Sequence, residues 1–218
     1  MDFLTGFPAV EHLVNFVSTF YWPLPLIFWP IPYGIPFLAI YLWTRSIERG
    51  VRQRPINEGF VDFDRGSWVL INYGIKAARL AAVFAALVTP PWTEGVGRLG
   101  LYGVGLGLMI TGTQLRRHCF RILGENFTFS VRVAGPDTLV EQGAYRSIRH
   151  PSYTGGMMYN VGIGLALTNW ESTLLLTVTM IIAYAYRVHI EECALIDVHG
   201  QQYRDYMRRT KRFIPFIY

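Results

Sequence analysis

The chain has 218 residues, 51% of them apolar and 16% charged, with a formal net charge of +5 at pH 7. Long uncharged runs punctuate it, and runs of roughly 17–25 residues are long enough to cross a bilayer core, which predicts an integral membrane protein. Nucleic-acid binding is disfavoured, because the basic residues flank apolar runs instead of forming one patch.

The first apolar run extends from His12 through Thr44 without a charge and is interrupted by Pro23, Pro25, Pro30, Pro32 and Pro36. Proline removes a helical donor and clashes with the preceding turn, so a single straight helix is not expected. We predict an interfacial or broken segment followed by a span that ends near Trp43, with a re-entrant pair as the alternative. The acidic, non-basic start of the chain does not predict a signal peptide.

Four further spans are predicted at Trp68–Val88, Leu99–Leu115, Tyr153–Leu167 and Thr173–Tyr186. A Pro90-Pro91-Trp92 turn separates the first two. The last two are joined by only a few residues, so they must pack as an antiparallel helical hairpin. The tail after Arg187 is predicted to be an amphipathic helix, broken near Gly200.

Arginine placement orients these spans. With five spans, all the arginine-rich stretches fall on one side: 45–54, 116–121, 146–149 and 204–212. The positive-inside rule makes that side cytoplasmic. We therefore expect an all-α, polytopic membrane protein with about five transmembrane helices. Residues 1–115 would form the N-terminal transmembrane region and residues 116–218 a catalytic region with a cytoplasmic loop, the hairpin and the amphipathic helix.

The first candidate site is the Arg149-His150-Pro151-x-Tyr153 cluster at the cytoplasmic mouth of the fourth span. Pro151 suits the first turn of a helix, where its missing donor would be unpaired anyway. Arg149 and His150 either anchor the helix end at headgroup depth or serve chemistry at the membrane surface.

The second candidate site is Arg187, Glu191 and Glu192, just beyond the fifth span. The hairpin returns these residues to the membrane face of His150. Arg187 and Glu191 are four residues apart and can simply pair on one helix face. Alternatively, a carboxylate here meets a cationic ligand such as a sulfonium or an ammonium group.

Three other patterns are weaker indications of a functional site. Gly103, Gly105 and Gly107 follow no strand, so close helix packing is a better interpretation than a dinucleotide fingerprint. Lys76 and Arg79 share a helix face and either mark a polar pocket within the second span or extend to the interface, which we favour. No metal site is expected, and Cys119 and Cys193 lack disulfide or metal spacing.

Together these residues resemble the isoprenylcysteine carboxyl methyltransferase family, within the membrane methyltransferases that include phospholipid N-methyltransferases. The resemblance covers roughly residues 123–215. It is carried by LGENFTFSVRV, LVEQGAYRSIRHPSYTG and RVHIEECALIDVHGQQYRDYMRRTKRFIPF.

The resemblance implies S-adenosylmethionine in a cytoplasm-facing pocket, closed by the loop before the hairpin and by the C-terminal helix. The cofactor would be lined by Thr138, Leu139, Val140, Gly143, Tyr145, His150, Pro151, Tyr153 and Glu192. Arg149, Glu191 and Arg209 would lie toward the transferring methyl group and a lipophilic or lipidated acceptor that enters from the bilayer.

One residue departs from the family pattern: Asp137 stands where the family often has histidine. The acceptor also stays open between a prenylated cysteine carboxylate and a phospholipid amine. A membrane sterol-type reductase that uses NADPH and a non-catalytic membrane scaffold are the competing interpretations. The length of the chain and the Glu191-Glu192 pair favour methyl transfer.

Overall fold

The structure is a computed structural model that describes residues 33–51, 61–89, 95–124, 131–133 and 139–214, together with residues 91, 93 and 127. The predicted broken segment before residue 33 lies outside the described residues, as do Pro90, Trp92, Asp137 and Thr138. The regular secondary structure of the described residues is helical, apart from one pair of two-residue strands. The predicted all-α class is confirmed for these residues.

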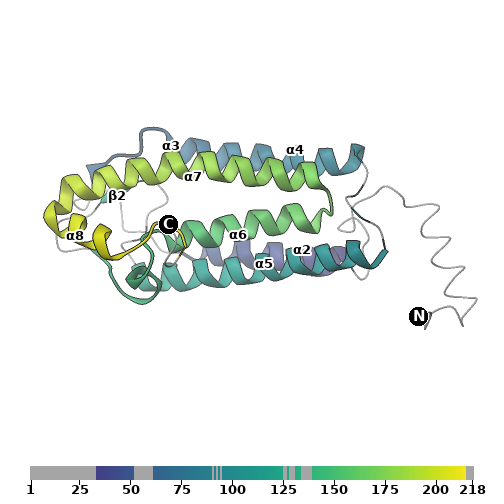
Figure 1. Ribbon diagram of the computed structural model, residues 1–218, viewed down its shortest axis with the longest axis horizontal. Coiled ribbons are helices and arrows are strands. Elements are labelled where there is room, and N and C mark those ends of the chain that lie inside the picture. Colours follow the sequence, from purple (N-terminus) through teal and green to yellow (C-terminus); the bar gives the residue numbers. More distant parts are fainter. Residues whose placement is uncertain are drawn as a thin grey trace, which may run out of the picture.

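The long helices lie along the long axis of the molecule (Figure 1). In chain order the helical segments are α2 (Ile35–Arg49), α3 (Ser67–Val69), the π-helical turn η3 (Leu70–Gly74), α4 (Ile75–Val88), α5 (Gly95–Leu123), the 3-10 turn η6 (Gly143–Arg146), α6 (Pro151–Ala166), α7 (Trp170–His199) and α8 (Gln201–Arg209). Strands β1 (Val61–Asp62) and β2 (Arg132–Val133) pair antiparallel, with Val61 opposite Val133.

Several helices extend beyond the predicted spans. The span expected to end near Trp43 is part of α2, which continues to Arg49, and α5 continues past residue 115 to Leu123. Arginine and glutamine are good helix formers, so leaving an apolar run does not end a helix. Helix α2 ends just before Gly50, and α5 ends just before Gly124.

Two stretches of the described residues, Ser67–Val88 and Trp170–His199, are helical, long enough and apolar enough to cross a membrane. Their outer faces are apolar: Leu80 and Phe84 on α4 are 74% and 65% exposed, and Ile182 on α7 is 61% exposed. Large apolar side chains are unfavourable in water and acceptable against lipid. The expected count of about five spans stays a prediction.

Helices α6 and α7 form the predicted antiparallel hairpin. The Asn169 side chain caps α7 by accepting a hydrogen bond from the Ser172 backbone N–H at 2.8 Å. The same side chain donates to Thr89 Oγ1 at 2.7 Å, and Ser172 Oγ donates to the Ala82 carbonyl at 2.6 Å. These polar contacts tie α4 to the turn of the hairpin, so the opposite, open end of the hairpin meets the start of α3.

Helices α5 and α6 touch backbone to backbone. A Cβ on Gly105 would lie 2.6 Å from the Gly162 carbonyl oxygen, and one on Gly112 would lie 2.5 Å from the Gly155 carbonyl oxygen. Small residues allow such close approach between helices in a membrane. The packing interpretation is confirmed for Gly105, whereas Gly103 and Gly107 have no neighbour within 4 Å where a Cβ would stand.

The chain turns sharply at Gly200, whose φ is +55°, as the sequence predicted. Helix α8 then packs back on the bundle through Tyr203 and Tyr206, which are both buried. Residues 211–214 return to the loop before α6, where Arg149 and His150 contact the backbone of Lys211 and Arg212. The C-terminal segment is thereby placed against the open end of the hairpin (Figure 1).

Candidate active site

The open end of the α6–α7 hairpin gathers most of the predicted site. Pro151 is the first residue of α6, as predicted, and His150 precedes it. One turn into α6, the Tyr153 hydroxyl donates a hydrogen bond to Glu191 Oε2 on α7. His150 Nε2 lies 3.3 Å from Glu192 Oε1. The predicted convergence of the two helix ends is confirmed.

Glu192 is the centre of a buried ionic cluster that includes Arg149, His150 and Arg212. Its side chain is 6% exposed. Oε1 accepts a hydrogen bond from Arg149 Nε at 2.9 Å and Oε2 accepts one from Arg212 Nη2 at 2.9 Å. A buried carboxylate is tolerated when charge-assisted hydrogen bonds satisfy both oxygens, which is the case here. We call Arg149, His150, Glu191, Glu192 and Arg212 the ionic cluster.

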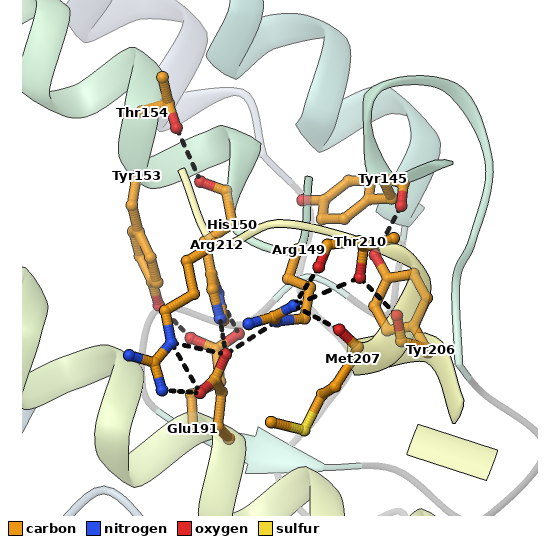
Figure 2. A network of polar contacts seen from close by, with 11 residues as sticks. Tyr145, Arg149, His150, Tyr153, Thr154, Glu191, Tyr206, Met207, Thr210 and Arg212 are labelled. Atoms are coloured by element: carbon orange, nitrogen blue, oxygen red, sulfur yellow. Dashed lines mark hydrogen bonds and ion pairs between the residues drawn. The ribbon is translucent and has the colours of Figure 1, made fainter. Parts of the chain in front are cut away.

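Arg149 also holds the C-terminal segment in place. Its Nη1 donates to the carbonyls of Met207 at 3.1 Å and Thr210 at 2.5 Å (Figure 2). Its backbone N–H donates to the Lys211 carbonyl at 2.7 Å. Arg149 therefore joins the loop before α6, the end of α7 and the chain after α8. Its expected position toward the acceptor stays a prediction.

A second set of contacts runs from Tyr153 to the start of α3. Arg187 Nε donates to the Tyr153 hydroxyl at 3.1 Å, and Arg187 Nη1 donates to Asp64 Oδ1 at 2.7 Å and to Ser67 Oγ at 2.8 Å. The Arg187 side chain is 4% exposed. Arg187 and Glu191, which the spacing could pair on one helix face, both contact the Tyr153 hydroxyl.

Asp64 is held as a carboxylate in this set. Burial by itself would raise the pKa of Asp64, but hydrogen bonds from the Trp68 and Val131 backbone N–H groups and the Ser67 hydroxyl lower it. The charge of Arg187 lowers it further, and the net effect is a pKa below the ordinary value. Asp64 is therefore an anion at neutral pH that orients Arg187 and, through it, Tyr153.

The loop before α6 supplies further predicted cofactor residues. Leu139 and Val140 are half-buried. Gly143 opens η6 with a φ of +59°, and a Cβ there would lie 2.2 Å from Ile122 Cδ1. Tyr145 is buried, and its carbonyl accepts a hydrogen bond from the Tyr206 hydroxyl at 2.6 Å. Burial raises the pKa of the Tyr145 phenol well above its ordinary value, which keeps it neutral.

Arg209 lies apart from the ionic cluster. Its Nη2 donates to Glu141 Oε2 at 2.5 Å, and its side chain is 60% exposed. The guanidinium also lies over the Tyr206 ring, 5.9 Å from the centroid. This contact fastens α8 to the loop before η6 at the surface.

Sequence reasoning missed three contributors. Arg212 belongs to an arginine-rich stretch that predicted only the orientation of the spans. Asp64 lies far from the motifs, and Tyr203 lies within one but has no predicted role. The Tyr203 hydroxyl is buried and has no hydrogen-bond partner among the described residues. Its neighbours include the charges of Glu192 and Glu191. The amphipathic pattern of α8, with tyrosines three residues apart facing inward, was the one signal that could have found Tyr203.

A cavity of about 470 Å³ lies beside the ionic cluster, lined by residues of α2, η3, α4, α5, α6 and α7. Tyr153 and Arg187 line it, so the Tyr153 hydroxyl borders both regions. Arg79 lines it as well, and its Nε donates to Asn160 Oδ1 on α6 at 2.8 Å. The expectation that Arg79 extends to the interface is wrong. Lys76, in contrast, is exposed and lies over the Tyr73 ring.

The arrangement defines a class of protein: a helical membrane bundle whose hairpin ends carry ionic groups beside a cavity. The same fold occurs in the solved structure of a eukaryotic intramembrane Ras methyltransferase, isoprenylcysteine carboxyl methyltransferase. The TM-score is 0.60 at 21% sequence identity, over 98% of this chain and 88% of that one. The two apolar helices and the shared fold together indicate that this chain is a membrane protein.

Sequence comparisons agree. The phospholipid methyltransferase family model matches residues 101–202. A probable protein-S-isoprenylcysteine O-methyltransferase of Oryza sativa subsp. indica is 32% identical over 116 residues, 52% of this chain and 61% of that protein. The protein-S-isoprenylcysteine O-methyltransferase of Tribolium castaneum is 34% identical over 119 residues, 54% of this chain and 42% of that protein.

The corresponding protein of Mus musculus is 32% identical over 128 residues. The predicted resemblance to the isoprenylcysteine carboxyl methyltransferase family is therefore confirmed. The match spans less than two thirds of the length of these relatives: 61%, 42% and 45% of the rice, beetle and mouse proteins. The match to the family model, residues 101–202, contains α6, α7 and the ionic residues of both.

Proposed function

We propose that this chain is a multi-pass membrane methyltransferase that transfers a methyl group from S-adenosylmethionine to a lipophilic acceptor. The observation that carries the proposal is the position of Tyr153. Its hydroxyl contacts Glu191 at the ionic cluster, and the residue lines the cavity inside the helical bundle. A water-soluble donor and a lipid-soluble acceptor can therefore meet at one side chain.

The chemistry of the site suits S-adenosylmethionine, which combines a sulfonium, an ammonium, a carboxylate and an aromatic base. Glu191 and Glu192 attract the cationic groups, while Arg212 suits the carboxylate. The Tyr203 hydroxyl, which has no partner in the part of the chain that the structure describes, offers one more hydrogen bond. Thr138, Leu139, Val140, Gly143 and Tyr145 stay the proposed lining on the side of the loop, with His150 and Pro151 continuing it.

The residues of the chain act by alignment. When bound, S-adenosylmethionine supplies an electrophilic methyl carbon, which forms a bond to the acceptor as its bond to sulfur breaks. Holding the two reactants in line contributes about 7–11 kcal/mol to the lowering of the barrier. Arg149 or Arg209 orients an acceptor carboxylate. For an amine acceptor, Glu191 takes the proton that is released, since its side chain is 29% exposed and reaches solvent.

We place the ionic cluster at the cytoplasmic face, on the side of the arginine-rich stretches. The acceptor then enters from the bilayer through the N-terminal transmembrane region, residues 1–115. It reacts at the catalytic region, residues 116–218. A prenylated cysteine carboxylate is supported by the names of the relatives. A phospholipid amine is the second candidate, because the matching family model is that of phospholipid methyltransferases.

Two measurements test the function. Calorimetry on the purified protein in detergent should show binding of S-adenosylmethionine and none of NADPH; NADPH binding would support a reductase, and binding of neither a scaffold. Incubation with methyl-labelled S-adenosylmethionine should then label either a prenylcysteine analogue or the amine headgroup fraction of a lipid extract. If the protein binds S-adenosylmethionine but labels neither acceptor, both proposed acceptors are wrong.

A further inference from the structure

The cavity inside the bundle carries a surplus of positive charge. Six of its lining residues are cationic, namely Arg45, Arg49, Lys76, Arg79, Arg116 and Arg187, and Glu48 is the one carboxylate among the described lining residues. Arg187 is already paired with Asp64, which lies outside the lining. Glu48 pairs with Arg116 at 3.1 Å and with Arg45 at 3.4 Å. The charge of Glu48 is therefore already used near the cytoplasmic end of the cavity.

Arg79 lies deeper, alongside the apolar stretch of α7. At one end of this stretch Arg187 contacts Ser67, and at the other Ser172 contacts Ala82. Arg79 precedes Ala82 by three residues, or about 4.5 Å of helix. Its partner Asn160 follows Tyr153 on α6 by seven residues, about 10 Å. Arg79 is therefore within the depth of the candidate span.

The contacts of Arg79 are with neutral groups. Its Nε donates to the Asn160 side chain, and its guanidinium lies 5.4 Å from the centroid of the Tyr159 ring. Asn160 is 2% exposed and also donates to the Gly156 carbonyl at 2.8 Å. Among the described residues, no carboxylate lies within ion-pairing distance of Arg79 or of Lys76, one turn earlier. An arginine at such depth normally faces the bundle interior and pairs with a counter-charge.

We propose that Arg79, assisted by Lys76, binds the anionic group of a membrane amphiphile, a phosphate or a carboxylate, inside the bundle. Asn160 holds the guanidinium in place for this contact. Ile71 and Ile75 line the same cavity and supply an apolar surface for the chain of the amphiphile. Because this site lies about two helical turns from Tyr153, it binds its ligand with or without the methyl donor.

Native mass spectrometry of the full chain in a neutral maltoside detergent tests the site. Phosphatidylglycerol, oleate, phosphatidylcholine and inorganic phosphate are added separately, without S-adenosylmethionine. Binding of phosphatidylglycerol or oleate should exceed that of phosphatidylcholine by about tenfold, because a charge-assisted contact is gained. Phosphatidylglycerol alone identifies a lipid phosphate, and oleate a carboxylate. Binding of inorganic phosphate alone would show a free-anion site and overturn the amphiphile.

Arg79→Gln should remove the preference, and Arg79→Lys should keep most of it. Arg208→Gln is the matched control, because that arginine is paired with Asp205 on the exposed face of α8. If Arg79→Gln does not fold, Lys76→Gln decides, since Lys76 is exposed and should weaken binding about threefold without loss of the fold. Equal retention of anionic lipid by wild type and both cavity variants would overturn the proposal, whatever the outcome for the methyl donor.

Discussion

The ionic cluster and the cavity beside it balance their charges in opposite ways. In the cluster, the Glu192 carboxylate contacts Arg149, His150 and Arg212, and Glu191 contacts Tyr153. In the cavity, cationic side chains exceed carboxylates six to one among the described lining residues. Arg187 is paired with Asp64, and Arg116 and Arg45 share Glu48. The cluster therefore has matched charges before a ligand arrives, whereas Arg79 and Lys76 in the cavity would gain a counter-charge from one.

This difference assigns different tasks to the two regions. A cluster with matched charges holds its geometry without a ligand, which favours alignment of a small donor. A cavity with surplus charge selects a ligand by its sign. Tyr153 lines the cavity and contacts Glu191 of the cluster, and Arg187 lines the cavity and contacts Tyr153, so variants at either residue should disturb both regions.

Arg187→Met should have the largest effect, because it breaks the link between the two regions. Asp64 would keep its charge without its arginine, and the Tyr153 hydroxyl would lose a donor. Removing one partner of a buried ion pair costs about 3–5 kcal/mol. Unfolding in detergent by denaturant measures the loss. Arg208→Met, at an exposed pair on α8, is the control, and equal stability of the two variants would contradict the link.

Glu192→Gln should come next, acting on the cluster alone. A glutamine has one acceptor oxygen, so only one of Arg149 and Arg212 would keep its hydrogen bond, and both would lose their counter-charge. We expect the affinity for S-adenosylmethionine to fall about 100-fold, and about tenfold in His150→Ala, as measured by calorimetry. Asp205→Asn on the exposed face of α8 should leave the affinity unchanged. If Glu192→Gln and His150→Ala both keep the wild-type affinity, the ionic cluster does not bind S-adenosylmethionine.

Gly112→Ala should follow, because it moves α6, which carries residues of both regions. The added Cβ would lie 2.5 Å from the Gly155 carbonyl oxygen, so the helices must separate. Overpacking of this kind costs about 1–3 kcal/mol. Gly107→Ala in the same helix meets open space and should be neutral or slightly stabilising, since alanine is the better helix former. Similar melting temperatures for both variants would contradict the close packing.

Much of this comparison was predictable from the sequence. The hairpin and its converging ends followed from two apolar runs with a short link, and the break at Gly200 followed from glycine between two amphipathic stretches. Charged residues beside those ends then had to meet, because α6 and α7 run antiparallel. Local patterns therefore placed Tyr153, Glu191 and Glu192 correctly.

The remainder depended on long-range contacts that no local pattern contains. Asp64 reaches Arg187 across 123 positions of the chain, and Asn160 reaches Arg79 across 81. Arg79 was misjudged because its depth depends on where α4 lies along α7, which the Ala82–Ser172 contact fixes. Hydropathy alone leaves that register open. The packing of Gly112 against Gly155 was missed for the same reason.

The Asp64–Arg187 pair predicts a modest dependence of stability on pH. The pKa of Asp64 is lower in the folded chain than in the unfolded one, so its ionised form stabilises the fold above the ordinary pKa of aspartate. This contribution is lost as the pH falls through the folded-state pKa. The difference in melting temperature between wild type and Asp64→Asn should therefore shrink in acid. A difference that stays constant from neutral pH to about pH 3 would contradict the ionised state.

Arg209→Gln should change stability least, because the Arg209–Glu141 pair lies at the surface and such pairs contribute about 0–1 kcal/mol. Donor affinity should also stay within about threefold of wild type, since Arg209 makes no contact with the ionic cluster. If Arg209 faces the acceptor, the variant should lower the rate of methyl transfer at saturating donor by about tenfold. The neighbouring Arg208→Gln is the control. Equal rates in the two variants would show that only the cluster and the cavity, and not α8, contact the reacting groups.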